Sequence, residues 1–85
     1  MLEPAQIRAA RALLGWHQEQ LAKRAKIGLA TLQRLERAPP GPVMAHVATV
    51  VKITGCLEKA GIAFPSDESA GIGVRFAKKA KAIVR

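Results

Sequence analysis

The chain has 85 residues, 49% of them apolar, and its 14 Lys and Arg residues against 6 Asp and Glu give a net charge of +8. A chain this short forms one small domain that buries only roughly 60–65% of its unfolded surface, so dimerisation would add useful burial. Plentiful Ala and Leu with no Tyr argue against a β-sandwich and for helices. The positive charge suits a polyanionic partner, which would be DNA, RNA or an anionic membrane.

Residue counts exclude several kinds of site. Cys56 is the single cysteine, so no intramolecular disulfide can form, and with only His17 and His46 elsewhere it cannot complete a zinc site. No nucleophile, base and acid stand in a recognisable catalytic arrangement, so we do not expect an enzyme. The first residues do not begin a signal peptide, and no apolar run reaches transmembrane length. We therefore expect a cytoplasmic protein with no membrane segment, metal or cofactor.

Two helices are predicted in the first 25 residues. Pro4 suits the first turn of a helix, where its missing N–H is not needed, and Gly15 is a suitable C-terminal cap. The second helix begins after His17, with Gln20 placed to return a hydrogen bond to that cap residue. Helical spacing assigns these residues to the inward faces: Ile7, Ala10, Leu13, Leu14, Leu21, Ala22 and Ala25.

A tight turn at residues 26–28 leads into a third helix at residues 29–37, with Leu32 and Leu35 facing inward. Three prolines and a glycine then forbid helix at residues 38–42 and form a stiff connector.

A fourth helix is expected from about Val43 or Ala45 to Ala60, with Gly61 ending it. Alternating apolar residues at 62–64 and 74–76 predict a β-hairpin around a turn-rich loop. The last residues are basic, and three interpretations stay open: a disordered arm that adds nonspecific DNA affinity, a short helix, or, least favoured, a membrane contact. The predicted divisions are a helical domain at 1–61, a hairpin extension of the same domain at 62–76 and a basic tail at 77–85.

Residues 18–37 (QEQLAKRAKIGLATLQRLER) meet the packing demands of two short helices that cross at a tight turn. Ala22 must be small there, because the second helix crosses closely. The block resembles the helix-turn-helix of the Cro/C1-type (XRE) regulators, the group of the lambdoid phage repressors. The resemblance is good from Ala5 to Arg37 and weaker beyond. It implies a mostly α, lambda-repressor-like domain of four helices followed by a C-terminal β-hairpin, and a role in sequence-specific DNA binding.

Three positions depart from the family's usual pattern. The family usually has Gly where this chain has Lys26, because that turn residue often takes a positive φ, and a non-glycine residue there carries a modest strain cost. His17 replaces a usual Ser, and Gly28 replaces a frequent Ser or Thr. These changes weaken capping and remove possible phosphate contacts, but they leave the pattern intact.

The outward face of the third helix is the predicted reading surface, because its N-terminal part would lie in the major groove. Arg34 can make a bidentate contact to guanine and Gln33 to adenine, while Leu29 and Ala30 can pack on thymine methyl groups. An ordinary solvated face is the alternative, which an exposed leucine beside Gln33 and Arg34 makes less attractive.

The DNA backbone would be held from both helices. The family resemblance implies a phosphate contact for Gln18, and Lys26, Thr31 and Arg37 are further candidates. The resemblance also implies an ion pair between Arg11 and Glu36, which agrees with the need of Glu36 for a partner among basic neighbours. We expect this pair to be structural. Trp16 and Cys56 are expected to be packing residues.

The predicted function is transcriptional regulation by a homodimer on double-stranded DNA, and repression is favoured because a repressor needs only to occupy its site. The interface candidates are the long helix around 47–57 and the hairpin edge at 62–64. One alternative is a protein-interaction module of the antitoxin or antiactivator type, with a protein partner. Another is an architectural DNA binder of a mobile element.

Overall fold

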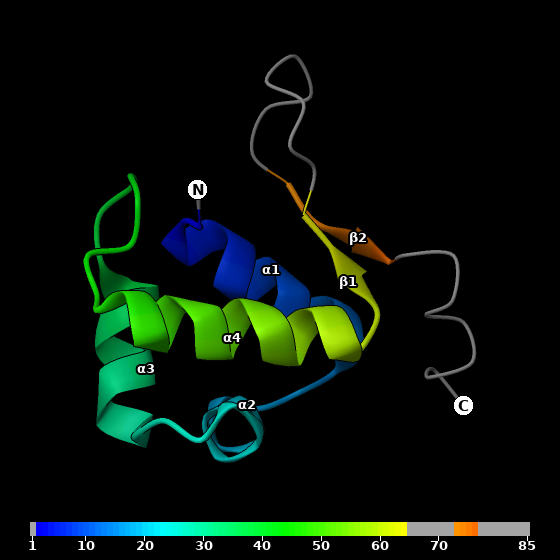
Figure 1. The fold of residues 1–85 in the computed structure, drawn as a ribbon. Coiled ribbons are helices and arrows are strands. Elements are labelled where there is room, and N and C mark those ends of the chain that lie inside the picture. The colour runs from blue at the N-terminus through cyan, green and yellow to red at the C-terminus, as the bar shows by residue number, and fades with distance from the viewer. Residues whose placement is uncertain (1, 65–72, 77–85) are drawn as a thin grey trace.

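The computed structural model describes residues 2–64 and 73–76, so the predicted basic tail and the middle of the hairpin loop lie outside the described residues. Four helices are followed by two short strands (Figure 1). The elements are α1 (Pro4–Leu14), α2 (Gln18–Ala25), α3 (Leu29–Arg37), α4 (Val47–Lys59), β1 (Ile62–Ala63) and β2 (Arg75–Phe76). The predicted mostly α fold with a terminal strand pair is confirmed.

The ends of the first two helices follow the chemistry of their flanking residues. The main-chain N–H of His17, which precedes α2, donates to Oε1 of Gln20 at 2.7 Å, as the sequence predicts. The same arrangement begins α1, where the N–H of Glu3 donates to Oε1 of Gln6 at 2.8 Å. Gly15 ends α1 with φ 69°, a left-handed conformation that glycine adopts without a steric cost.

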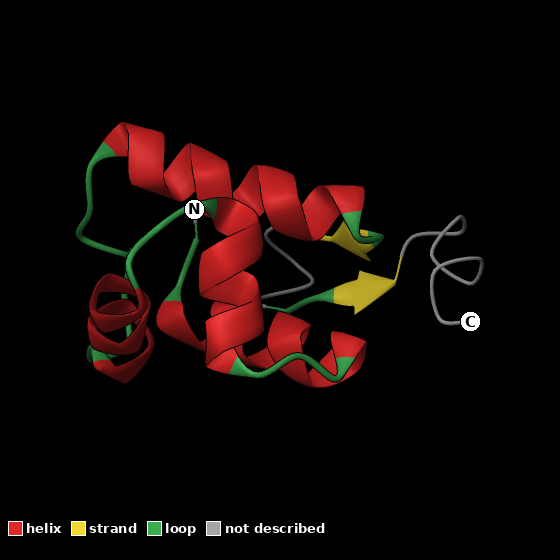
Figure 2. Cartoon of the chain, turned by 90° about the horizontal axis from the view of Figure 1, so that it is seen from below, coloured by secondary structure: helices red, strands yellow, loops and turns green. Residues whose placement is uncertain are grey.

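The core lies where the helices and β1 meet. The helix α2 packs against both α3 and α4, while α1 packs against α3. The strands lie at the opposite end of the molecule from α3 (Figures 1 and 2). Most predicted inward residues are buried, but Leu13 is 41% exposed. The largest fully buried side chains are those of Ile7, Leu21, Leu32, Leu35, Ile53, Leu57 and Ile62.

The predicted start of the fourth helix is wrong, because α4 begins only at Val47. The connector before it is attached to the N-terminal segment instead. The N–H of Val43 donates to the main-chain oxygen of Leu2 at 2.9 Å, and the N–H of Gly41 donates to Oε1 of Glu3 at 3.1 Å. These bonds hold the connector outside the helix, so that His46 becomes the residue that precedes α4.

The strand pair is shorter than predicted, with two residues in each strand. It is antiparallel and pairs Ile62 with Phe76. The side chain of Gln6, which is buried in α1, donates from Nε2 to the main-chain oxygen of Gly73 at 3.1 Å. The chain that leads into β2 is therefore bonded to α1 as well as to its partner strand.

Candidate nucleic-acid interface

The turn between α2 and α3 is built around a lysine with a left-handed backbone. Lys26 has φ 61° and ψ 47°, a conformation that non-glycine residues rarely adopt. Its N–H donates to the oxygen of Lys23 at 3.2 Å, and the N–H of Ile27 donates to the oxygen of Ala22 at 3.0 Å. These bonds satisfy carbonyl groups at the end of α2 and turn the chain directly into α3.

The helix α3 has one buried side and one solvent-facing side. Leu32 and Leu35 are buried in the core. On the other side Ala30, Arg34 and Arg37 are exposed. Their spacing along the helix places these three residues on one face, and we call them the α3 stripe. A short helix with an uninterrupted, partly basic outer face can enter a groove of nucleic acid.

The structure places the predicted contact residues in α3, at the start of α2 and in the turn between the two helices. Leu29 is half-buried and packs against the core, so only part of its side chain is free for a base contact. Among the rest, Ala30, Arg34, Lys26 and Arg37 are exposed, whereas Gln33, Gln18 and Thr31 are half-buried.

An ion pair on the inner side of α3 joins this helix to α1. Glu36 is only 3% exposed, so its charged carboxylate is buried. Arg11 meets it with both edges of its fork, from Nε to Oε2 at 2.7 Å and from Nη2 to Oε1 at 2.9 Å. The hydrogen bond to Glu36 raises the pKa of Arg11 further above its ordinary value, although burial acts in the opposite direction.

The same carboxylate also reaches α2. Gln18, the first residue of α2, donates from Nε2 to Oε1 of Glu36 at 3.0 Å. Arg11 continues from Nη1 to the main-chain oxygen of Trp16 at 2.9 Å, just before α2. Arg8 donates to the main-chain oxygen of Glu36 near the end of α3. We call these contacts the Arg11–Glu36 junction; they fix the orientation of both helices of the motif relative to α1.

Comparison with known proteins agrees with this geometry. A helix-turn-helix family model matches residues 7–56, which is more than half of the chain. The chain belongs to the Cro/C1-type helix-turn-helix family. None of the curated proteins matches its sequence. The matched range includes every residue of the junction and of the α3 stripe. Membership of this family identifies the protein as a DNA-binding transcription regulator.

A hollow beside the stripe of this Cro/C1-type protein was missed by the sequence reasoning. It measures about 490 Å³, and its lining includes Arg34 and Thr31 from α3 and His46 and Thr49 from the beginning of α4. The first N–H groups of a helix are free to meet an anion, so this hollow extends the candidate interface beyond the two helices of the motif. The hollow was not predicted because the predicted fourth helix began before His46, whereas His46 in fact precedes α4.

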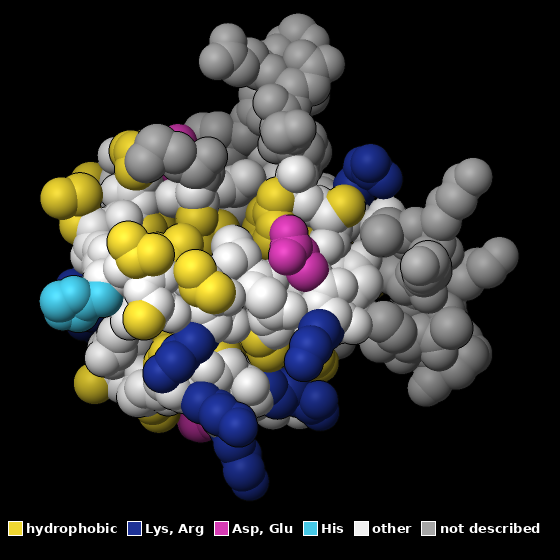
Figure 3. Space-filling model, in the orientation of Figure 1, with side chains coloured by type: hydrophobic (Ala, Val, Ile, Leu, Met, Phe, Trp, Pro, Cys, Tyr) yellow, Lys and Arg dark blue, Asp and Glu magenta, His cyan; other side chains and the backbone are white. Residues whose placement is uncertain are grey.

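Charge is unevenly distributed over the face seen in Figure 3. Lys and Arg side chains gather in the lower part of that view, where α2 lies, whereas apolar side chains gather over the first half of α4.

No described group of three His, Cys, Asp or Glu residues is arranged to hold a metal ion. Among the described helices, none is long and apolar enough to cross a membrane.

Proposed function

We propose that this Cro/C1-type protein represses transcription in the cytoplasm by occupying operator DNA as a homodimer, with α3 in the major groove. The observation that carries the proposal is the α3 stripe, an exposed row whose direction is fixed by a buried ion pair on the other side of the same helix. Repression is favoured over activation because a bound dimer blocks a promoter by occupancy alone. The burial of Ile62 among the helices supports treating the hairpin as part of the DNA-binding domain.

Base recognition would come from α3. Arg34 is exposed and can bond both acceptors of guanine with its planar fork. Gln33 can pair with adenine, and the small exposed side chain of Ala30 can contact a thymine methyl group. The free edge of Leu29 can make a second methyl contact at the N-terminal end of the helix. These four residues would supply the sequence preference of each half-site.

Phosphate contacts would flank the reading helix. Lys26 and Arg37 are exposed cations at opposite ends of α3. Thr31 borders the hollow that also contains His46, so a phosphate there could meet both side chains. Gln18 already donates one amide N–H to Glu36, so its second N–H can donate to a phosphate and its oxygen can accept from water. Such contacts set the register of the protein on DNA without reading its sequence.

Dimerisation would follow from the small footprint of one helix. One recognition helix covers a few base pairs, and symmetric dimers bind half-sites about one helical turn (~34 Å) apart. The exposed large apolar residues near the start of α4 are the best supported interface, because Met44, Val47 and Val51 are 83%, 78% and 60% exposed. Light scattering at micromolar concentration, with and without operator, compares the chain with its Val47→Lys variant. A wild-type chain that binds as one copy per site would refute the dimer.

The decisive experiment is the selection of bound sequences from random duplex DNA. We expect a palindromic consensus with a guanine in each half-site. The Arg34→Ala variant should lose the preference for that guanine. Retention of a protein partner without retention of DNA would instead indicate an antitoxin-like or antiactivator-like module. Bending of DNA with little sequence preference would indicate an architectural protein.

A further inference from the structure

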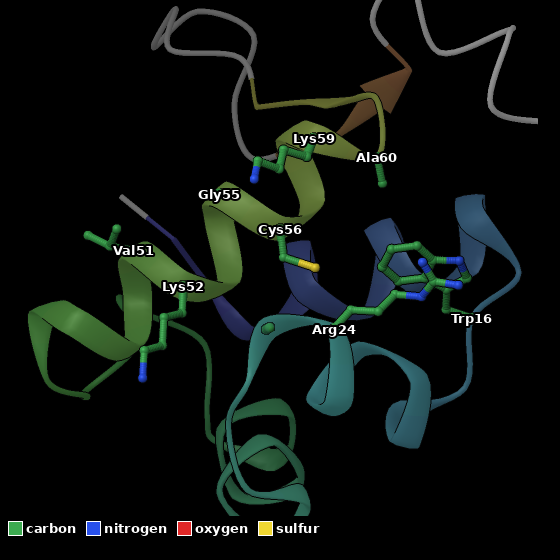
Figure 4. A pocket seen from close by; sticks show the side chains of 9 residues that line it. Trp16, Arg24, Val51, Lys52, Gly55, Cys56, Lys59 and Ala60 are labelled. Atoms are coloured by element: carbon green, nitrogen blue, oxygen red, sulfur yellow. The ribbon is translucent and has the colours of Figure 1, made fainter.

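A groove of about 650 Å³ lies between α2 and α4, away from the α3 stripe (Figure 4). Trp16 and Arg24 form one wall, and Lys52, Cys56 and Lys59 of α4 form the other. None of these residues belongs to the predicted DNA contacts. The groove is therefore a second concave surface that the DNA-binding proposal does not use.

Positive charge surrounds this α2–α4 groove. The guanidinium carbon of Arg24 lies 4.7 Å from the centre of the Trp16 ring. Lys52 and Lys59, both exposed, are two helical turns apart on α4 and border the same opening. No Asp or Glu occurs in the described lining of the groove. An anion that entered it would meet three cations, and none of the described lining residues is acidic.

The interior of the groove is apolar. Figure 4 shows the Trp16 ring and the thiol of Cys56 on its inner side, with small Ala60 nearby. Gly55 also lines the groove and faces open space, because a Cβ built there would have no heavy atom within 4 Å. Burial raises the pKa of the Cys56 thiol, while the charges of Arg24 and Lys59 act in the opposite direction. The field of those cations therefore reaches the apolar interior.

We propose that the α2–α4 groove binds an amphipathic organic anion, a small molecule with a flat apolar body and one acidic group. Its volume lies within the roughly 300–1,000 Å³ that small-molecule sites occupy, and such sites combine an apolar lining with a few polar groups. The flat body would lie in the apolar interior beside Cys56 and Ala60, and the acidic group would face Lys59 and Arg24. A DNA phosphate fits this groove less well, because it could bond to the cations but would leave the apolar interior unfilled.

The chain carries its own reporters for a test, because Trp16 is the only tryptophan and Cys56 the only cysteine. The anionic probe is 8-anilinonaphthalene-1-sulfonate, and the matched uncharged probe is N-phenyl-1-naphthylamine, which lacks the sulfonate. Quenching of Trp16 fluorescence measures affinity, and the rate of Cys56 alkylation by iodoacetamide locates the bound probe. We expect saturable binding of one anionic probe, slower alkylation at saturation, and affinity for the uncharged probe weaker by about tenfold.

A pair of charge reversals tests the role of the cations. Lys59→Glu and Lys23→Glu alter the net charge equally, and both lysines occupy the last turn of their helix, so the two variants share the same unfavourable helix-dipole term. Of these two lysines, Lys59 lines the groove and Lys23 does not. We expect Lys59→Glu to weaken the anionic probe by about tenfold or more and Lys23→Glu by less than about twofold. If Lys59→Glu unfolds in a thermal melt, Lys59→Gln takes its place and should retain an intermediate affinity.

Three results would each overturn the proposal. The first is equal binding of the two probes, which would leave the cations without a role. The second is unchanged Cys56 alkylation at saturating probe, which would place the probe on another apolar surface such as that of Val47. The third is slower alkylation of Cys56 in the presence of duplex DNA, together with equal losses of probe affinity in Lys59→Glu and Lys23→Glu. That result would make the groove a general contact for phosphates.

Discussion

Glu36 lies on the opposite side of α3 from its neighbours Arg34 and Arg37, and its surroundings differ from theirs. The two arginines are exposed and make no bond to another described element, whereas Glu36 is buried and bonded to α1 and α2. A reading surface needs side chains that are free to meet DNA, but it also needs a helix whose direction does not vary. The comparison indicates that the junction supplies direction and the stripe supplies recognition, so changes to the two should separate stability from specificity.

Loss of the junction should have the largest effect. Arg11→Ala leaves the Glu36 carboxylate buried without its ion-pair partner, which typically costs about 3–5 kcal/mol. Arg11 is 21% exposed at its side chain, so water can replace part of the bond and the lower end of that range applies, about 3 kcal/mol. For a domain of this size the melting temperature should fall by more than about 10 °C. A thermal melt by circular dichroism measures the change.

The control for that variant is Arg37→Ala, which removes an exposed arginine one residue from Glu36. We expect it to change stability by less than about 0.5 kcal/mol. Equal melting temperatures for Arg11→Ala and Arg37→Ala would show that the junction adds no stability, and the contrast between the two sides would fail.

Removal of Arg34 should affect binding and leave folding intact. Arg34→Ala is expected to cost about 1–3 kcal/mol in operator affinity and to relax the preference at one base pair per half-site. Arg34→Lys should recover charge but not the base preference, because only the planar fork bonds both guanine acceptors. Binding to a panel of single-base operator variants distinguishes the outcomes. An equal loss on every operator would make Arg34 a phosphate contact.

A smaller and different loss is expected at the other end of the stripe. Arg37→Gln should weaken binding to all sequences alike, since a phosphate contact carries no sequence information. A dimer would lose two phosphate contacts, so the slope of log K against log salt should become shallower by about 1.8. Titrations at several salt concentrations give this slope. A changed base preference in Arg37→Gln would move Arg37 from the backbone group to the reading group.

The sequence was sufficient for features that depend on local chemistry. Gly15 and Gln20 mark the helix ends, and helical spacing identified Leu32 and Leu35 as buried. Contacts between distant segments escaped it. No local pattern shows that Val43 donates to Leu2 or that α4 begins only at Val47. The hollow that Arg34 shares with the start of α4 was therefore not predicted.

The junction and the groove show the same division within the site. The family resemblance implied the pair of Arg11 with Glu36, but the bond from Gln18 to that carboxylate required the structure. Trp16 and Cys56 were predicted to be packing residues, and both are half-buried. Their common position in the α2–α4 groove depends on how α2 packs against α4, which helical periodicity does not define.

The smallest expected effect concerns the turn that connects the two helices. Lys26 holds a φ of 61°, where a side chain is strained, so Lys26→Gly should stabilise the fold by roughly 0.5–1 kcal/mol. The matched variant Lys26→Ala retains a Cβ and therefore the strain, while both variants remove the same charge. Both should weaken DNA binding equally and make the salt slope shallower by about 1.8 for a dimer. Only the glycine variant should gain stability, because the strain belongs to the backbone and the phosphate contact belongs to the side chain.

Chemical denaturation of the two Lys26 variants measures the change in stability, and salt titration measures the change in DNA binding. Unequal DNA affinities would show that the backbone of the turn, and not only the Lys26 ammonium, helps to place α3 on DNA.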